Sequence, residues 1–185
     1  MIYLTISSGI GAGVIVDGTV LSGWDGNAGE VGHITLDPDG VMPCGCGKRG
    51  HWEAYCSGEN VPLYAKELHS GQDTALAVDD PDLSAADVFA LAGSDRFADQ
   101  VIDRVAEWNA QGVASLIHAY APIVIYIGGA VALNNPELVV DRLREGVPER
   151  VMTNVPDIRL TTLGDDVVVK GALASAINTP VGETT

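Results

Sequence analysis

The sequence predicts an α/β fold with a mixed sheet and helices on its faces, and three observations support this. The chain opens with short apolar runs separated by glycine-rich turns. Its middle has the periodicity of a long helix, and a continuous apolar run then ends at a glycine pair. Strands on both sides of a helical region are typical of a mixed sheet. A chain of 185 residues with 46% hydrophobic residues can form one domain with a real core.

The opening segment is predicted to hold three short, consecutive antiparallel strands. Residues 2–6 form an apolar run, and residues 14–21 form two apolar runs around Asp17–Gly18. An Asp-Gly pair between apolar runs is a strong hairpin signal. Residues 30–40 resemble a further strand that runs into a Pro-Asp-Gly turn.

The middle of the chain is predicted to be helical. Ser84, with Asp87 three residues later, resembles a capping box at the start of a helix. From Asp95 onward, apolar residues recur at multiples of about 3.6 as far as Tyr120. This pattern predicts a long amphipathic helix that ends before Pro122.

The last third returns to strands. Residues 123–130 form a continuous apolar run, which is typical of a strand buried on both faces. Residues 135–146 begin with an Asn-Pro pair suited to a helix start, and residues 157–163 resemble another strand. In residues 167–178, the valines favour a strand and the small residues favour a helix.

The composition is strongly acidic, with a formal net charge of −15. Such a surface repels nucleic acid phosphates and anionic lipid, so neither is expected as a partner. Acidic, lysine-poor chains are typical of high-salt cytoplasm, although an ordinary acidic protein is the alternative. The N-terminus lacks a basic targeting region, and no apolar run is long enough to span a bilayer. We therefore expect a cytoplasmic protein.

A glycine-rich stretch, residues 7–13, follows the first strand. A dinucleotide-binding loop of the Rossmann type needs a helix directly after it, whereas this stretch leads into a strand. Its backbone N–H groups could still bind phosphate, with help from the hydroxyl of Ser7 or Ser8. A tight turn without a ligand explains the residues equally well.

All three cysteines lie within thirteen residues, beside two histidines. Cys44, Cys46, His51 and His33 offer two thiolates and two imidazoles, which suit tetrahedral zinc. A disulfide between Cys44 and Cys46 would close a very small, strained ring. The alternative is a glycine-rich loop with two free thiols. Cys56 is expected to pack as a small apolar residue.

Two glutamates and a histidine accompany this cluster. Glu30 and His33 precede it and Glu53 follows it. Carboxylates accept hydrogen bonds from hydroxyl groups, so these residues could line a pocket for a hydroxyl-rich ligand. The alternative is that they are ordinary solvated side chains.

Four motifs together resemble the ROK family (repressors, open reading frames and kinases), whose catalytic members are ATP-dependent sugar kinases, notably glucokinases. "NAGEVGHITLDPDG" followed by "CGCGKRGHWEAYCSG" is similar to the family signature. "YLTISSGIGAGVIVDG" resembles its second phosphate segment, "IVIYIGGAV" its adenosine segment and "LGDDVVVKGALASA" its closing loop and helix. The resemblance covers essentially the whole chain.

The resemblance implies an actin-like, ribonuclease-H-like ATPase lobe, with residues 1–185 as the C-terminal lobe and a zinc loop inserted at about 33–53. It favours a helix over 167–178. It also implies site residues of three kinds: Glu30, His33 and Glu53 for sugar hydroxyls; Ser8, Gly9 and Gly11 for the phosphates of MgATP, with Gly128 and Gly129 for its adenosine; and His33, Cys44, Cys46 and His51 for structural Zn²⁺.

The sequence departs from the family pattern at three points. Ser7–Ser8 stands where the family often has Gly-Thr, and His51 stands where many members have a third cysteine. The family's first phosphate loop, Asp-Gly-Gly-Thr, and its catalytic Asp are absent. We therefore expect the catalytic base upstream of Met1 and no catalytic residue in this chain.

The expected reaction of the complete protein is phosphorylation of a hexose, with glucose to glucose 6-phosphate favoured. This chain alone is expected to be weak or inactive without its N-terminal lobe. A complementing N-terminal half or a homo-oligomer is the expected protein partner. The alternatives are a sugar-sensing ROK regulator and an inactive, zinc-stabilised fragment.

Overall fold

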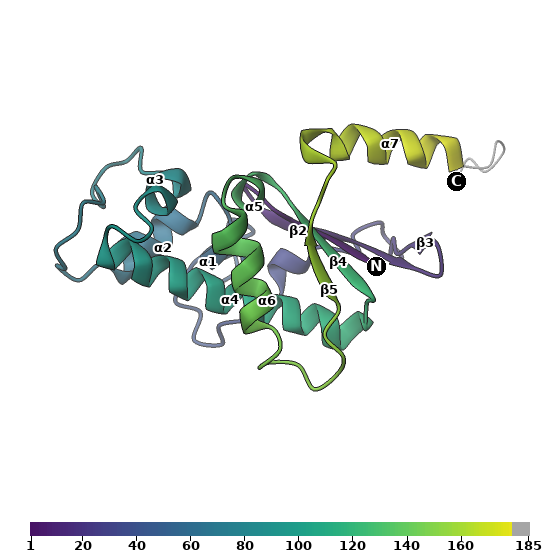
Figure 1. The fold of residues 1–185 in the computed structure, drawn as a ribbon, viewed down its shortest axis with the longest axis horizontal. Coiled ribbons are helices and arrows are strands. Elements are labelled where there is room, and N and C mark those ends of the chain that lie inside the picture. Colours follow the sequence, from purple (N-terminus) through teal and green to yellow (C-terminus); the bar gives the residue numbers. More distant parts are fainter. Residues whose placement is uncertain (179–185) are drawn as a thin grey trace.

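The computed structural model describes residues 1–178, and among these a mixed five-stranded sheet forms the centre of the fold (Figure 1). The strand order is β3-β2-β1-β4-β5. β1 pairs antiparallel with β2 and parallel with β4, and β4 pairs parallel with β5. The strands are β1 (Ile2–Ile6), β2 (Ile10–Val16), β3 (Thr19–Val20), β4 (Val124–Gly128) and β5 (Asp157–Leu160).

The central strand shows why this sequence forms a sheet with one covered face. Ile2, Leu4 and Ile6 are fully buried, while Tyr3 and Thr5 between them are partly exposed. Successive side chains of a strand point to opposite faces, so the three apolar residues share the face that packs on the helices. This alternation fixes the register of β1 against its neighbours.

The helices group mainly along that face and at one end of the sheet (Figure 1). The long helix α4 (Arg96–Tyr120) confirms the predicted amphipathic helix, and it ends at Ala121, whose φ is 43°. The remaining α-helices are α1 (Glu53–Cys56), α2 (Val61–Leu68), α3 (Ala85–Ala90), α5 (Ala130–Asn134), α6 (Arg142–Gly146) and α7 (Val167–Asn178).

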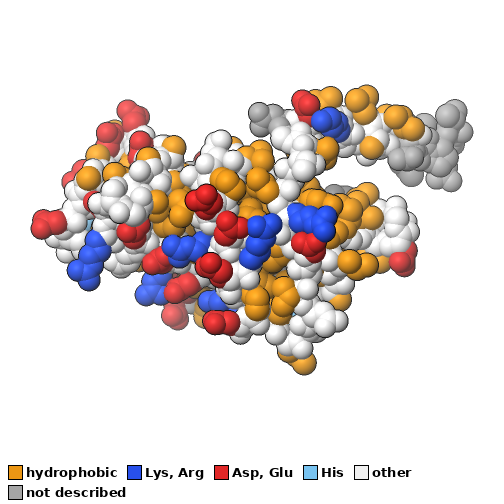
Figure 2. Space-filling view, viewed as in Figure 1, with side chains coloured by type: hydrophobic (Ala, Val, Ile, Leu, Met, Phe, Trp, Pro, Cys, Tyr) orange, Lys and Arg blue, Asp and Glu red, His pale blue; other side chains and the backbone are white. Residues whose placement is uncertain are grey.

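α7 confirms the helical reading of residues 167–178 and stands apart from the rest of the lobe (Figure 1). Figure 2 shows apolar side chains along this helix, whereas acidic and basic side chains alternate over α4 and α6. The exposed apolar side chains of α7 are Val168, Val169, Leu173 and Ile177.

The prediction of a strand over residues 30–40 is wrong. Val31–His33 forms a short 3₁₀ turn, and Leu36 and Asp37 both donate backbone hydrogen bonds to the carbonyl of Gly50. These bonds attach the segment to the cysteine loop rather than to the sheet. The third antiparallel strand is instead the short β3, in the second arm of the Asp-Gly hairpin.

Two other boundaries differ from the prediction. Residues 10–13 of the glycine-rich stretch belong to β2, so the turn itself is Ser7–Gly9. The helix expected over 135–146 begins as a π-helical turn, Glu137–Asp141, before it becomes α6. Asn135 does not cap it, because its side-chain amide donates to the carbonyl of Val131 in α5.

Parallel pairing of β1 and β4 brings their carboxyl ends to the same edge of the sheet. The turn Ser7–Gly9 follows β1, and the pair Gly128–Gly129 ends β4. The backbone N–H of Ala130 lies 3.4 Å from Oγ of Ser7, which joins the two turns. Loops at this edge are the usual ligand sites of such sheets.

None of the helices described here combines the length and apolar character needed to cross a lipid bilayer.

Candidate functional site

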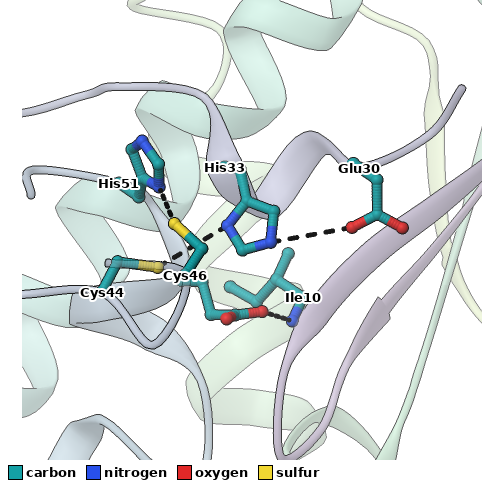
Figure 3. A network of polar contacts seen from close by, with 7 residues as sticks. Ile10, Glu30, His33, Cys44, Cys46 and His51 are labelled. Carbon is teal, nitrogen blue, oxygen red and sulfur yellow. Dashed lines mark hydrogen bonds and ion pairs between the residues drawn. The ribbon is translucent and has the colours of Figure 1, made fainter. Parts of the chain in front are cut away.

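The cysteine loop brings the four predicted metal ligands together. Sγ of Cys44 lies 3.6 Å from Nδ1 of His33, and Sγ of Cys46 lies 3.3 Å from Nδ1 of His51 (Figure 3). All four ligand atoms lie within 4.8 Å of one another. Tetrahedral zinc, with usual bond lengths to sulfur and nitrogen, separates such atoms by about 3.6 Å. The geometry and donor set are therefore compatible with zinc.

A tight turn presents the two thiols to the histidines. The N–H of Gly47 donates to the carbonyl of Cys44, and the N–H of Cys44 donates to the carbonyl of Lys48. Gly47 has a φ of 84°, which lies in the left-handed region that favours glycine. Gly47, directly after Cys46, thus allows a turn that a residue with a side chain would resist.

Electrostatics around the loop favour the neutral forms of Cys44 and His51. Burial raises the pKa of the Cys44 thiol, although a hydrogen bond from the backbone of Cys46 opposes this. Burial also lowers the pKa of His51, as does the nearby His33. A neutral imidazole is ready to coordinate a metal, whereas a thiol must first release its proton.

Two of the three predicted sugar residues lie side by side. Nε2 of His33 is 3.7 Å from Oε2 of Glu30, while the other ring nitrogen of His33 faces Cys44 (Figure 3). His33 therefore connects the cysteine loop with the exposed carboxylate of Glu30. Both residues follow Gly29, whose carbonyl accepts a hydrogen bond from the N–H of Ala12 in β2.

The third predicted sugar residue, Glu53, turns toward the glycine turn. Its Oε2 accepts a 2.8 Å hydrogen bond from the backbone N–H of Ile10. A Cβ atom at Gly9 would lie only 2.8 Å from the same oxygen. Gly9 is thus required for the carboxylate to reach the turn, so a residue predicted for the sugar contacts the turn predicted for the phosphates.

The other residues predicted to bind phosphate do not lie together in one turn. Ser8 is exposed at the tip of the turn, where its hydroxyl faces solvent. Gly11 lies inside β2 opposite Thr5, beyond the turn. Ser7, the other hydroxyl that the glycine-rich stretch offered, places its Oγ near the N–H of Ala130.

The glycine pair after β4 is shaped by close contacts. Gly129 has a φ of 88°, and a Cβ there would lie 2.4 Å from the carbonyl oxygen of Ile6. A Cβ at Gly128 would lie 2.0 Å from the hydroxyl oxygen of Tyr3. These glycines allow the end of β4 to lie directly against β1.

A pocket of about 380 Å³ opens beside Gly129, between α3 and α5. Ser84 and Phe89 line one side, and Ala130 and Asn134 line the other. The sequence singled out Ser84 only as a helix cap. The capping box at Ser84 predicts where α3 begins, but it does not predict that α3 lies next to Gly128–Gly129.

Two further residues missed by the sequence reasoning brace the cysteine loop. The hydroxyl of Tyr55 donates to the buried carboxylate of Asp37 and accepts a hydrogen bond from the N–H of Met42. Burial would raise the pKa of Asp37, but hydrogen bonds from Tyr55 and from the Val41 and Asp39 amides hold it below its usual value. Tyr55 thereby attaches α1 to the loop.

Cys56 plays no part in the cluster, as predicted. It is fully buried, and its Sγ donates to the carbonyl of Val105 in α4 at 3.5 Å. Burial raises the pKa of this thiol well above its usual value. It packs as a small core residue.

The mixed sheet carries two glycine-containing turns at one edge, Ser7–Gly9 after β1 and Gly128–Gly129 at the end of β4. This arrangement matches a lobe of the actin-like ATPase class. The ROK family profile matches residues 1–179. The chain belongs to the ROK family.

Named relatives agree with this assignment. A glucokinase of Pyrobaculum calidifontis is 38% identical over 97% of this chain and 58% of its own length. The ROK hexokinase structure from Thermus thermophilus is 36% identical, with a TM-score of 0.80 over 92% of this chain and 54% of that one. A Streptomyces griseus ROK glucokinase in complex with glucose and AMPPNP is 28% identical, with a TM-score of 0.76 over 92% and 58% of the two chains. The chain thus spans a little over half the length of these relatives.

Proposed function

We propose that this chain is the lobe of an ATP-dependent hexose kinase that holds most of the sugar site and half of the nucleotide site. In the complete protein, the γ-phosphoryl group of MgATP would pass to the 6-hydroxyl of glucose. The observation that carries the proposal is the position of Glu53, between the cysteine loop and the phosphate turn. A kinase needs its sugar and its phosphate donor in contact, and Glu53 lies where the two sites meet.

On the sugar side, we assign Glu30, His33 and Glu53 to the hydroxyl groups of the hexose. Glu30 is exposed and has a free carboxylate oxygen beside His33. Glu53 uses Oε2 for the Ile10 amide, which leaves Oε1 for a hydroxyl. Carboxylates accept hydrogen bonds from sugar hydroxyls, which supports this assignment. Glucose is favoured by the names of the relatives.

On the nucleotide side, we assign the turn Ser7–Gly9 and the hydroxyl of Ser8 to the phosphates. Gly128 and Gly129 lead into the pocket between α3 and α5, which we assign to the adenosine. The pocket is lined by apolar side chains, among them Phe89, together with a hydroxyl and two amides, which suits a flat, partly polar base. Gly11 lies within β2, so its role would be limited to backbone contact with a neighbouring phosphate.

We assign a structural zinc ion to His33, Cys44, Cys46 and His51. The two sulfur–nitrogen separations and the closed set of four ligands support this. A metal held by four protein ligands keeps no open position for a substrate, so its role is to fold the loop. Through His33, the folded loop would orient Glu30.

The general base is assigned to the part of the relatives that this chain does not span. Within residues 1–178, the two glutamates nearest the site, Glu30 and Glu53, are assigned to binding the sugar hydroxyls and not to proton transfer. Loss of a general base typically costs about 10²–10⁴ in rate, so this chain alone should transfer little phosphate. The protein is further proposed to be cytoplasmic, with a homo-oligomer or a complementing N-terminal half as partner.

Calorimetric titration of this chain with glucose, and separately with MgADP, tests the proposal. Binding of both, with glucose bound more tightly than fructose or N-acetylmannosamine, is the expected result. A chain that binds zinc and folds but takes up neither ligand would contradict the assignment. Release of ADP from MgATP that depends on glucose, by the chain alone, would contradict only its proposed inactivity.

A further inference from the structure

One short segment, α1 and the turn after it, makes several hydrogen bonds to the phosphate turn. The carbonyl of Ser7 accepts a 2.6 Å hydrogen bond from the N–H of Gly58, and the carbonyl of Ser8 accepts one of 3.4 Å from Glu59. The N–H of Ile10, directly after the turn, donates to Oε2 of Glu53. Helix α1 and the turn after it thus contact the phosphate turn at both ends.

The same segment is fastened to the cysteine loop. The hydroxyl of Tyr55 bridges Asp37 and Met42 of the loop, and the N–H of Trp52 donates to the carbonyl of Ile34. His51, a predicted metal ligand, lies two residues before Glu53. No solvent-filled gap separates the parts, because Trp52 and Tyr55 are buried.

Burial makes this segment a stiff connection. Ala54, Cys56 and Ser57 are fully buried between the loop and α4. Packed side chains of this kind transmit a displacement instead of absorbing it, since protein cores are close-packed. Release of the cysteine loop therefore removes the support on which Glu53 and the turn after α1 rest.

We propose that Glu53 is a positioning residue for the phosphate turn, and that the metal-bound cysteine loop orders the nucleotide site through α1. This inference rests on the proposed function for the identity of the two ligands, but the physical connection is independent of it. Its consequence is that zinc acts on both substrates. Order in the loop favours order in the phosphate turn, and by thermodynamic linkage a ligand on the turn stabilises the loop.

The coupling is measurable as the exchange rate of the Ile10 amide hydrogen in the 185-residue, zinc-loaded chain. Glu53→Ala removes the acceptor, and loss of a hydrogen bond to a charged group should raise this exchange rate by about tenfold or more. Glu53→Gln retains a carbonyl oxygen at the same distance and should keep most of the protection. Glu67→Ala is the matched control, because Glu67 is an exposed glutamate of α2 that lies outside both the turn and the cysteine loop.

Zinc removal by a chelator provides a second, independent arm. The exchange rate should rise at Ile10 as well as at Gly50, whose amide is bonded within the loop to the carbonyl of Met42. The amide of Val147, bonded to Leu143 in α6, should be unchanged. If Glu53→Ala does not fold, this arm decides, since release of Gly50 with an unchanged Ile10 would overturn the inference.

The outcomes separate this inference from the proposed function. Unchanged exchange at Ile10 in folded Glu53→Ala, with sugar binding lost, would overturn the inference and leave the kinase proposal standing. Faster exchange at Ile10 in Glu53→Ala and after chelation, with no glucose bound by the parent chain, would support the inference and contradict the sugar assignment. Faster exchange in Glu67→Ala as well would also overturn it, because the effect would not be specific to Glu53.

Discussion

The hydroxyl of Tyr55 donates a hydrogen bond to the carboxylate of Asp37, and both groups are buried. Tyr55 also stacks obliquely on Trp108, with ring centroids 4.8 Å apart. Tyr55→Phe should keep this stacking but leave the Asp37 carboxylate and the N–H of Met42 without their partner. Loss of a buried hydrogen bond to a charged group should lower the free energy of unfolding by about 1–3 kcal/mol. Chemical denaturation measures this.

Tyr120→Phe is the matched control for that experiment. Tyr120 lies at the exposed end of α4, so its substitution should change the free energy of unfolding by less than about 0.5 kcal/mol. Equal effects of the two substitutions would show that the Tyr55–Asp37 bond contributes nothing particular to the fold.

The helix cap at Asp95 should make part of the stability pH-dependent. Backbone N–H groups of Ala98 and Ala75 donate to its carboxylate and lower its pKa. The stabilisation is therefore present above the unfolded-state pKa of about 4 and is lost as pH falls through the lower pKa of the folded state. Asp95→Asn replaces Oδ2, which accepts from the Ala75 amide, by an NH₂ group that cannot accept. It should therefore lower the free energy of unfolding near neutral pH by about 1 kcal/mol or more and remove this part of the pH dependence.

Thermal unfolding of the parent and of Asp95→Asn is measured from pH 7 to pH 2. The difference between their free energies of unfolding gives the contribution of Asp95. Asp79→Asn serves as the reference, because Asp79 is exposed on the acidic loop. A parent–variant difference that stayed constant with pH would exclude the cap as its source.

Metal analysis should give one zinc per chain, with the thiols of Cys44 and Cys46 both needed. Cys44→Ser should lose the zinc and destabilise the loop, since metal binding is coupled to folding of such sites. Cys56→Ala should also lower stability, through a small cavity in the core, but keep the zinc. Zinc retained by Cys44→Ser, or well below one zinc in the parent, would contradict the Cys₂His₂ assignment.

Gly129 should be intolerant of substitution, because a Cβ would lie 2.4 Å from the carbonyl of Ile6 and the φ of 88° is strained for other residues. Gly129→Ala should cost about 2–4 kcal/mol of unfolding free energy. Gly171→Ala, in exposed α7 with nothing near the added Cβ, should instead stabilise the chain by about 0.5–1 kcal/mol. Denaturant unfolding of both variants provides the comparison, and a loss at Gly171 as large as at Gly129 would contradict this reading.

Features that depend on residues close together in the sequence could be predicted from it. Asp95 caps α4 through amides two and three residues away, and the proposed metal ligands Cys44, Cys46 and His51 lie within one loop. Local turn chemistry and helix periodicity suffice for such features. The order of apolar runs and helical periodicity predicted the α/β class with a mixed sheet, and the family resemblance added the actin-like assignment and the helical reading of α7.

Features that depend on contacts between distant segments could not be predicted. Residues 30–40 have the composition of a strand, but Gly32 lies against the carbonyl of Ile10 and Leu36 is bonded to Gly50. Likewise, the direction of Glu53 follows from the position of Ile10, 43 residues earlier. Such tertiary contacts override local propensity, and no pattern within either segment reveals them.

Because Gly9 and Glu53 approach each other closely, a substitution at one position affects which residues fit at the other. A methyl group at position 9 would occupy the space of the Glu53 carboxylate, so Gly9→Ala should push that side chain away from Ile10. Shortening residue 53 to aspartate would relieve the crowding, and the double variant Gly9→Ala/Glu53→Asp should be more stable than the sum of the single effects predicts. A double-mutant cycle would then report a favourable coupling energy, whereas strict additivity would mean that the two positions vary independently. Redesign of the sugar pocket at position 53 therefore has to begin with the glycine at position 9.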